Sequence, residues 1–255
     1  MTRSEDSGII NNNIRCKFTY ITFYLPAGCV YPDTVMIETI KKVFKVAVTG
    51  GAGSGKSFVC NRLKELGIKI ISSDALARET VVPGSTAHEK IFNYFGPKVL
   101  LSDGTLDRQM LRRIIVNDGA ARLSLEQFIH PEISKLMQQK IVQAEQQGNR
   151  VVVVEVPLLF ELGMEKQFDL IFVVSADRKL RAERLIDRDN VSCREAEKLL
   201  NVQMPDKKKV ERGGVVLSNN GSKEQLIRSV DQLYEKYFKN RQKGSKILDR
   251  QEIMF

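Results

Sequence analysis

Short, continuous apolar runs recur along this chain from residue 46 onward. Such runs lie at 46–49, 68–71, 151–156, 170–174 and 215–217, and most are rich in Val and Ile. They do not alternate between apolar and polar positions, which is typical of strands covered on both faces, as in a parallel sheet between helices. The pattern predicts an α/β fold in three layers with a sheet of five parallel strands.

Helical patterns fill the segments between these runs. Helices are expected at 56–66, 178–188, 192–203 and 222–238, and each strand, helix, strand unit implies a right-handed crossover. Between the second and third strands four helical patterns follow one another, at 74–80, 86–95, 107–117 and 119–147. We therefore predict a helical insertion over 74–147.

The ends of the chain differ from this body. Residues 1–43 start with polar sequence, and their one apolar run, 18–25, falls well short of the roughly 20 residues needed to cross a membrane. We interpret 1–43 as a disordered or dispensable extension, 44–238 as the folded domain and 239–255 as a basic, frayed tail. Residues 1–45 and 239–255 together carry about +5 of the net charge of +9, so this charge favours solubility over a nucleic-acid groove.

The four cysteines, at 16, 29, 60 and 193, have neither metal-site spacing nor the density of a disulfide scaffold. We expect reduced thiols in a reducing compartment. Two separated histidines also argue against a zinc site.

A glycine-rich turn after the first strand carries the strongest chemical signal. Residues 50–57 match G-x-x-x-x-G-K-[ST], the loop whose backbone amides surround a phosphate group. We predict that Lys56 reaches the β- and γ-phosphates and that the Ser57 hydroxyl binds Mg²⁺. The residues expected to bind the nucleoside triphosphate here are Gly51, Ala52, Gly53, Ser54, Gly55, Lys56, Ser57 and Phe58.

Two carboxylates follow other strands of the predicted sheet. Ligands of open parallel sheets bind beyond the carboxyl ends of the strands, so Asp74 should face the γ-phosphate. On position alone, this residue fits a base for an attacking hydroxyl and a helix N-cap equally well. Glu155 interrupts a run of valines, where an unpaired carboxylate would be costly, and we interpret it as a Mg²⁺ ligand.

Basic residues supply further candidates. Arg184 and Arg188 lie where a helix should give way to a lid over 178–210, and guanidinium groups suit the charge that develops in phosphoryl transfer. Arginines recur at spacings of three and four along this helix. We interpret its other two arginines, Arg178 and Arg181, as solvated, and likewise the lysines at 207–209. Arg78 is a candidate for binding the phosphates of the acceptor. His130, which precedes Pro131, fits either a structural role or a contact to a polar part of the acceptor, and His88 is given no role.

Taken in order, these motifs resemble the dephospho-CoA kinase family over about residues 46–238. The resemblance rests on the phosphate loop, on 73–78, 83–84, 103–108, 130–131, 156–161, 188–189, 203–205 and 218–222. It implies a P-loop kinase fold with a helical lid and a helical substrate-binding insertion, in which ATP phosphorylates the ribose 3′-hydroxyl of dephospho-CoA. It also places Asp74 as the catalytic acid, Thr49 in the acceptor site and Asn219 in the nucleotide site.

From the phosphate loop, the cysteine pattern and this resemblance together we expect ATP and Mg²⁺ as cofactors and a monomeric, cytoplasmic enzyme without nucleic-acid or membrane partners. The chain departs from the family at Glu155, where Asp is frequent, and at Gly213 and Gly214, where Ala and Asp are frequent. We expect this glycine pair near the adenine, where it would relax nucleotide selectivity. The alternatives considered are a kinase of another nucleoside or nucleotide, a slow ATP- or GTP-hydrolysing switch, and a basic nucleic-acid binder.

We expect residues 1–35 to be dispensable, because an ordinary approach to the first strand begins at Met36. A chain that starts at Met36 should therefore keep the thermal unfolding midpoint and the kinase activity of the full chain. Loss of either property would contradict this interpretation.

Overall fold

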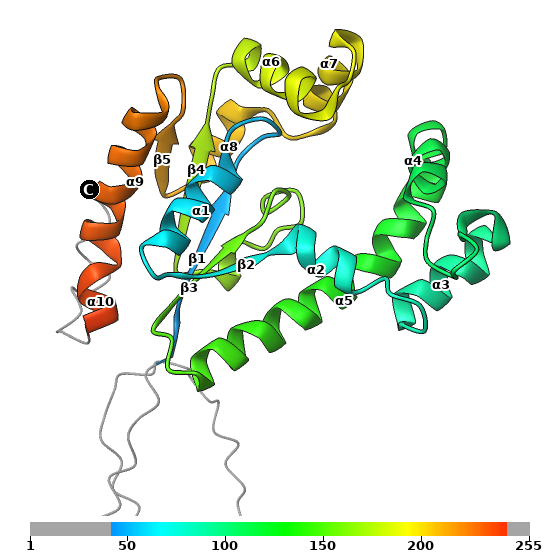
Figure 1. The fold of residues 1–255 in the computed structure, drawn as a ribbon, viewed down its shortest axis with the longest axis horizontal. Coiled ribbons are helices and arrows are strands. Elements are labelled where there is room, and N and C mark those ends of the chain that lie inside the picture. Colours follow the sequence, from blue (N-terminus) through cyan, green and yellow to red (C-terminus); the bar gives the residue numbers. More distant parts are fainter. Residues whose placement is uncertain (1–41, 244–255) are drawn as a thin grey trace, which may run out of the picture. The chain divides into compact units, whose positions relative to one another are not determined.

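Five parallel strands form one sheet in the order β2-β3-β1-β4-β5 (Figure 1). The computed structural model describes residues 42–243, so most of the expected extension, with Cys16 and Cys29, and residues 244–255 lie outside the described residues. The strands are β1 (Phe44–Thr49), β2 (Lys69–Ser72), β3 (Val151–Glu155), β4 (Leu170–Ser175) and β5 (Val215–Ser218). The predicted α/β fold with a five-stranded parallel sheet is confirmed.

The register brings the carboxyl ends of the strands together. Glu155 at the end of β3 lies opposite Val48 of β1 on one side and opposite Ser72 of β2 on the other. On the far side of β1, Thr49 pairs with Val173 of β4. The turns that follow β1 and β2 therefore leave the sheet beside Glu155.

Alternate positions of the central strand belong to different cores. Val46 and Val48 pack with α1 (Lys56–Glu65) and α9 (Lys223–Tyr237), whereas Ala47 packs with α2 (Ser73–Glu79) and the second half of α5 (Gly119–Gln146). A short helix, α8 (Asp206–Arg212), joins the second core through Val210. Burial on both faces explains why the strands have no polar alternation.

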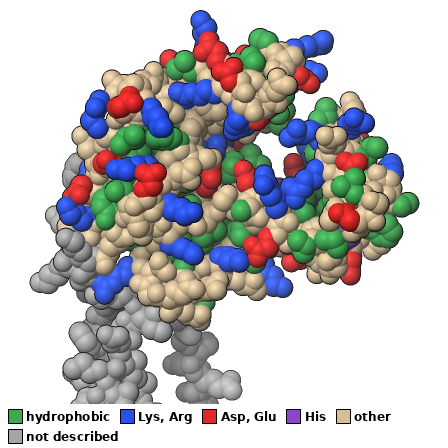
Figure 2. All heavy atoms as spheres, in the orientation of Figure 1, with side chains coloured by type: hydrophobic (Ala, Val, Ile, Leu, Met, Phe, Trp, Pro, Cys, Tyr) green, Lys and Arg blue, Asp and Glu red, His purple; other side chains and the backbone are tan. Residues whose placement is uncertain are grey.

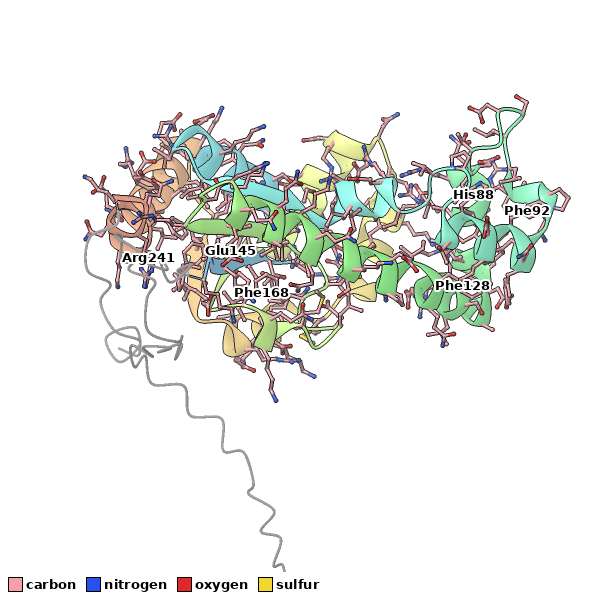
Figure 3. The ribbon with its side chains drawn as sticks, turned by 90° about the horizontal axis from the view of Figure 1, so that it is seen from below. His88, Phe92, Phe128, Glu145, Phe168 and Arg241 are labelled. Atoms are coloured by element: carbon pink, nitrogen blue, oxygen red, sulfur yellow. The ribbon has the colours of Figure 1, made fainter. Side chains whose placement is uncertain are left out.

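The helical insertion has an apolar core of its own. It is formed by α3 (Thr86–Phe95), a 3₁₀ turn at Pro97–Val99, α4 (Arg108–Asn117) and the first half of α5. His88 is buried there, and its Nε2 lies 2.9 Å from the Gly104 carbonyl oxygen. Figure 3 shows His88 and Phe128 together in this part of the molecule.

Helix α5 belongs to both cores. Leu125 packs in the insertion, and Met137 and Ile141 pack under the sheet. Pro131 lies inside the helix between these two sets. At the other end, the Glu145 carboxylate accepts a hydrogen bond from the Val43 amide at 3.0 Å and so joins α5 to the start of β1 (Figure 3).

Two helices, α6 (Arg178–Asp189) and α7 (Cys193–Val202), lie within the segment 178–210 that the sequence analysis interprets as a lid. Asn190 takes a left-handed conformation with φ 50° and ends α6, a conformation that Asn tolerates better than most residues. Ser192 and Glu195 then form a capping box at the start of α7. A second 3₁₀ turn, Glu165–Gln167, precedes β4.

Among the described residues no helix combines the length and the apolar character that crossing a membrane requires. The expected frayed tail is partly wrong, since α10 (Lys239–Lys243) continues from α9. Arg241 lies 4.1 Å above the centre of the Phe44 ring and donates to the Tyr237 carbonyl at 2.7 Å. This contact covers the start of β1, which explains the added turn of helix.

The expectation that 207–209 is solvated is also wrong for Lys209. Its side chain is fully buried, its Nζ lies 2.8 Å from Glu161 Oε1, and it donates to the Pro157 carbonyl at 3.1 Å. A buried ammonium group requires such a carboxylate partner. The pair joins α8 to the turn that follows β3.

Gly213 and Gly214 connect α8 to β5. They precede β5, and β5 runs from Val215 opposite Phe172 toward Ser218 opposite Ser175, so the glycines lie away from the carboxyl ends where the phosphate loop is found. A Cβ atom on Gly213 would lie 2.1 Å from Val173 Cγ2. This glycine is needed for close packing on β4.

We predict that Gly213→Ala lowers the free energy of unfolding by about 1–3 kcal/mol, the usual cost of overpacking. Gly214→Ala is the matched control, because its Cβ would come no closer than 3.5 Å to a neighbour, and we expect a change of at most about 0.5 kcal/mol. Chemical denaturation of both variants measures the difference. Equal stability of the two variants would contradict the packing argument.

Candidate active site

The phosphate loop, residues 50–57, connects β1 to the first turn of α1. Gly50, Gly53 and Gly55 have φ values of 146°, 72° and 98°, a region that side chains with a Cβ atom rarely adopt. Gly55 is also the N-cap of α1, and no side chain caps the helix there. The first two amides of the helix, those of Lys56 and Ser57, are therefore available to an anion.

Four consecutive carbonyl groups of the loop each accept a hydrogen bond from a side chain. Gly51 is bound by Lys56 Nζ at 3.0 Å, and Ala52 is bound by Arg181 Nε at 2.8 Å. Gly53 is bound by Arg184 Nη1 at 3.4 Å, and Ser54 is bound by Asn219 Nδ2 at 2.8 Å. These contacts fix the orientation of the peptide planes, and with it the direction of the N–H groups.

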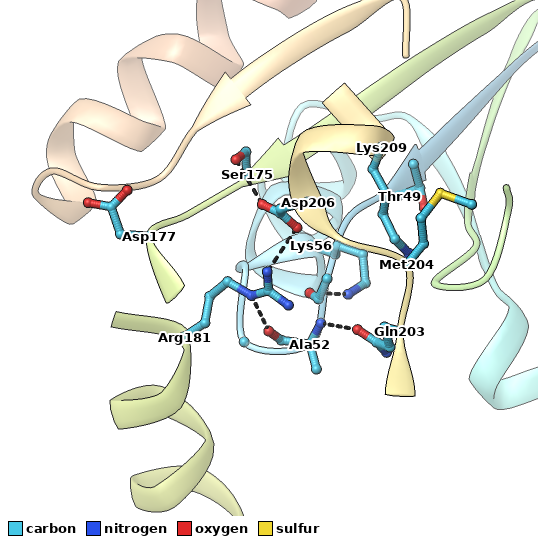
Figure 4. A network of polar contacts seen from close by, with 12 residues as sticks. Thr49, Ala52, Lys56, Ser175, Asp177, Arg181, Gln203, Met204, Asp206 and Lys209 are labelled. Carbon is cyan, nitrogen blue, oxygen red and sulfur yellow. Dashed lines mark hydrogen bonds and ion pairs between the residues drawn. The ribbon is translucent and has the colours of Figure 1, made fainter. Parts of the chain in front are cut away.

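The assignment of Arg181 to a solvated surface is wrong. Its side chain is buried, and a Cβ atom on Gly51 would lie 2.0 Å from its Nη2 atom. Nη1 forms an ion pair of 2.9 Å with Asp206, whose other oxygen accepts from Ser175 at 2.8 Å (Figure 4). Burial lowers the pKa of Arg181, and the Asp206 carboxylate opposes that shift.

Ser57 and Glu155, the two expected Mg²⁺ ligands, are in contact. The Ser57 hydroxyl donates to Glu155 Oε1 at 2.8 Å, and Glu155 is 8% exposed. A hydroxyl and a carboxylate beside a phosphate loop are hard oxygen ligands of the kind that Mg²⁺ uses while it retains several waters. The residues present therefore fit this ion.

The ammonium group of Lys56 is the cation at the centre of the site. Burial lowers its pKa to about 8, and the neighbouring cations Lys209 and Arg181 add to this shift. The carboxylates of Glu155 and Asp74 oppose it. Both carboxylates therefore act on the same ammonium group, as expected if Asp74 faces the loop.

Asp74 is not the cap of its helix. Helix α2 begins one residue earlier than expected, and the Ser72 hydroxyl accepts from the Ala75 amide at 3.5 Å as its N-cap. Asp74 lies in the first turn, where its side chain is exposed. The alternative role of Asp74 as a helix N-cap is therefore excluded.

A cavity of about 740 Å³ opens beside the loop. Figure 2 shows Lys and Arg side chains gathered around a hollow on this face. Of the residues singled out from the sequence, its walls contain Ala52, Gly53, Lys56, Ser57, Asp74, His130, Glu155 and Arg188. Apolar side chains line it as well, among them Ile133 and Met137 of α5 and Leu158 of the turn after β3.

Other predicted residues lie outside this wall. Thr49 is fully buried, and its hydroxyl lies 3.5 Å from the Pro157 carbonyl, so it is not exposed to an acceptor. Arg78 is exposed on α2 but does not line the cavity. Arg184 lies on the opposite side of the loop, where it also donates to the Asn219 carbonyl at 3.0 Å.

Phe58 and Asn219, two residues expected to bind the nucleotide, also have contacts within the protein. The Phe58 amide donates to the Gly55 carbonyl at 3.1 Å, and the Phe58 ring packs against the core between α1 and α9. Asn219 is 8% exposed, and a Cβ atom on Gly55 would lie 2.2 Å from its Nδ2. The close approach explains why residue 55 is glycine.

Gln203 is a residue of the site that could not be recognised from the sequence. Its Oε1 accepts a hydrogen bond of 2.7 Å from the Ala52 amide, and its side chain lines the cavity (Figure 4). In the sequence, Gln203 belongs to the motif 203–205. This motif supports the family resemblance but does not indicate a contact with the phosphate loop.

Comparisons with known proteins agree on one family. Residues 44–225 match the family described as dephospho-CoA kinase. The chain is 41% identical over 193 residues to the dephospho-CoA kinase of Geobacter sulfurreducens, covering 76% of this chain and 98% of the relative. It is 40% identical to a dephospho-CoA kinase domain-containing protein of Danio rerio, over 76% of this chain and 85% of the relative.

The chain is also similar to solved structures. TT1252 from Thermus thermophilus is similar with a TM-score of 0.67 and 31% identity, over 77% of this chain and 98% of that chain. The dephospho-CoA kinase from Campylobacter jejuni has a TM-score of 0.59 and 26% identity, over 78% of this chain and 98% of that chain.

The lowered pKa of Lys56 predicts that nucleotide binding takes up a proton. At about pH 8.5 roughly three quarters of the ammonium groups are neutral in the free enzyme, and a bound triphosphate favours the charged form. Uptake should be close to zero at about pH 7, where the group is already protonated. Titration calorimetry of Mg-ATP in buffers of different ionisation enthalpy measures it.

Lys56→Arg is the control, because arginine stays protonated across this range. This variant should bind Mg-ATP without the pH-dependent uptake. Uptake of the same size in both proteins would assign the proton to another group.

Proposed function

The chain belongs to the dephospho-CoA kinase family, and from this premise we propose how its own residues carry out the family reaction. The reaction phosphorylates dephospho-CoA and is the last step of coenzyme A biosynthesis. A kinase of this family uses ATP as phosphate donor. The observation that supports our assignment most strongly is that Lys56, Ser57, Glu155 and Asp74 all line one cavity.

The triphosphate of ATP binds along the phosphate loop in our proposal. The carbonyls of Gly51, Ala52, Gly53 and Ser54 are held by side chains, so the loop amides are already oriented before the nucleotide arrives. Lys56 Nζ has three N–H donors, so it can bind the β- and γ-phosphates as well as the Gly51 carbonyl. Asn219 and Arg184 act as positioning residues of the loop, because their polar atoms are engaged with its backbone.

Mg²⁺ would be held by Ser57 and, directly or through a water molecule, by Glu155. When bound, it neutralises charge on the β- and γ-phosphates. Glu155 already accepts the Ser57 hydroxyl, so the two side chains need no large movement to share an ion.

Asp74 orients the acceptor hydroxyl and receives its proton. The ribose 3′-oxygen of dephospho-CoA then forms a bond to the γ-phosphorus while the bond from that phosphorus to the leaving oxygen of ADP breaks. Arg188 lines the same cavity, and the Asp74 carboxylate contributes to its raised pKa, after the larger effect of the hydrogen bond to Asp189. A permanently charged Arg188 is therefore placed to stabilise the charge of the transferring phosphoryl group.

The rest of the acceptor occupies the cavity between the loop and α5. His130 lies on its wall and can bind a polar group of the acceptor, and the apolar side chains of Ile133 and Met137 suit its uncharged arm. Thr49 and Arg78, which do not line the cavity, have no place in this proposal.

We further propose that the enzyme acts as a monomer in the cytoplasm without nucleic-acid or membrane partners. Family members act on small-molecule substrates. The support for the compartment is the supply of ATP and the absence of a disulfide pattern in the sequence.

With Mg-ATP and a panel of hydroxyl acceptors, we expect mass spectrometry to detect phosphate transfer to dephospho-CoA. Asp74→Asn should lower kcat on the order of 10²–10⁴-fold because the acceptor loses its base. The Kd for ATP should change by less than about threefold, since the carboxylate contacts the acceptor and not the donor.

Glu79→Gln is a suitable control, because Glu79 lies on the same helix and pairs with Lys140 on the surface at 3.1 Å. It should retain the wild-type kcat. Full activity of Asp74→Asn would disprove the assigned role, and transfer only to a nucleoside or nucleoside monophosphate would indicate a different acceptor.

A further inference from the structure

A side chain from the lid contacts the phosphate loop on the side that faces the cavity. Gln203 follows α7 in an extended conformation, with φ −89° and ψ 157°. Its Oε1 accepts the Ala52 amide at 2.7 Å, and its side chain shares the cavity wall with Lys56, Asp74 and Arg188. The other lid contacts to the loop, from Arg181 and Arg184, bind carbonyl groups.

The orientation of the Gln203 carboxamide follows from this bond. A backbone N–H can be bound only by the amide oxygen, because the amide nitrogen is itself a donor. The two atoms diverge from one carbon, so Nε2 must point away from Ala52. It can donate a hydrogen bond while Oε1 remains on the loop.

The segment around Gln203 is held from both sides. The next residue, Met204, donates its amide to Glu161 Oε1 at 3.1 Å. Three residues after Gln203, Asp206 binds Arg181 at 2.9 Å and Ser175 at 2.8 Å. Lys209 adds its buried ion pair with Glu161 at 2.8 Å. Such anchoring makes the position of Gln203 a property of the fold rather than of one flexible side chain.

We propose that Gln203 is a further catalytic residue, which stays bound to the Ala52 amide and donates from Nε2 to the transferring phosphoryl group. Three equatorial oxygens of this group carry the charge in the transition state. Lys56 and Arg188 supply charged donors, and Gln203 adds a neutral donor in a fixed position. The proposal rests on the phosphoryl-transfer function proposed above.

Two roles without catalysis are possible for Gln203, and each leads to different kinetics. If Gln203 only covered the Ala52 amide in the free enzyme, ATP would have to displace it. Its removal would then tighten ATP binding and leave kcat unchanged. If the bond to Ala52 only shaped the loop, a variant that keeps this bond would be almost fully active.

Two variants of the full chain separate these cases. Gln203→Met has a similar length and neither donor nor acceptor, and we expect kcat to fall about 10–100-fold with the Kd for ADP changed less than about threefold. Gln203→Glu keeps an acceptor for the Ala52 amide but replaces the donor by an anionic oxygen. Its kcat should fall further than that of Gln203→Met.

The matched control is Asn201→Asp. Asn201 is exposed on α7 and uses its Oδ1 to accept from Arg178 at 2.7 Å, a bond that a carboxylate retains. The same amide-to-carboxylate change, two residues away and outside the cavity, should leave kcat within about twofold of wild type. Thermal unfolding midpoints of all variants show whether each is folded.

A second readout does not depend on turnover. The complex of ADP, aluminium fluoride and dephospho-CoA mimics the transferring phosphoryl group, and its affinity should fall in Gln203→Met in proportion to kcat, whereas ADP affinity should not. Unchanged kcat in Gln203→Met, or a smaller loss in Gln203→Glu than in Gln203→Met, would overturn the proposal. Lack of dephospho-CoA phosphorylation by the wild-type chain would instead refute the proposed function.

Discussion

Hydrogen bonds to the carbonyl groups of the phosphate loop are the interaction on which the site depends. Consecutive peptide planes in such a loop can turn in several ways, because its glycines impose few limits. Here Lys56, Arg181, Arg184 and Asn219 each bind one carbonyl between residues 51 and 54. The loop is therefore shaped before a ligand is present, and binding does not have to supply the cost of ordering it.

These donors come from separate elements, and this explains how the fold supports the loop. Arg181 and Arg184 belong to the lid helix α6, Asn219 follows β5, and Lys56 begins α1. Because the strands are parallel, the turns after β1, β4 and β5 all lie at the same edge of the sheet. The buried Arg181 connects this edge to Asp206 and thereby to α8.

The strands and the phosphate loop could be predicted because their signals are local. Continuous runs of Val and Ile indicate buried strands, and the spacing of glycines in residues 50–57 is specific. Arg181 and Lys209 were misjudged for a physical reason. Charged residues on a helix are normally solvated, and their carboxylate partners, Asp206 and Glu161, lie too far along the chain to be paired from spacing alone.

For Asp74, the position in the sequence fitted two roles, a base for the acceptor hydroxyl and a helix N-cap. The structure excludes the N-cap role. Ser72 is the N-cap of α2, so the Asp74 carboxylate is not needed to cap the first amides of this helix. Gln203 could not be assigned from the sequence because its contact is to a backbone amide, which carries no residue signature.

Helix α5 is interrupted by a proline where it passes the cavity. Pro131 has no N–H, so the carbonyl of Gln127 lacks its partner within the helix at the turn between the two sets of packed side chains. The helix is least resistant to bending at this turn, beside His130 in the cavity wall. A bend at this turn would change the width of the cavity in which we propose that the acceptor binds.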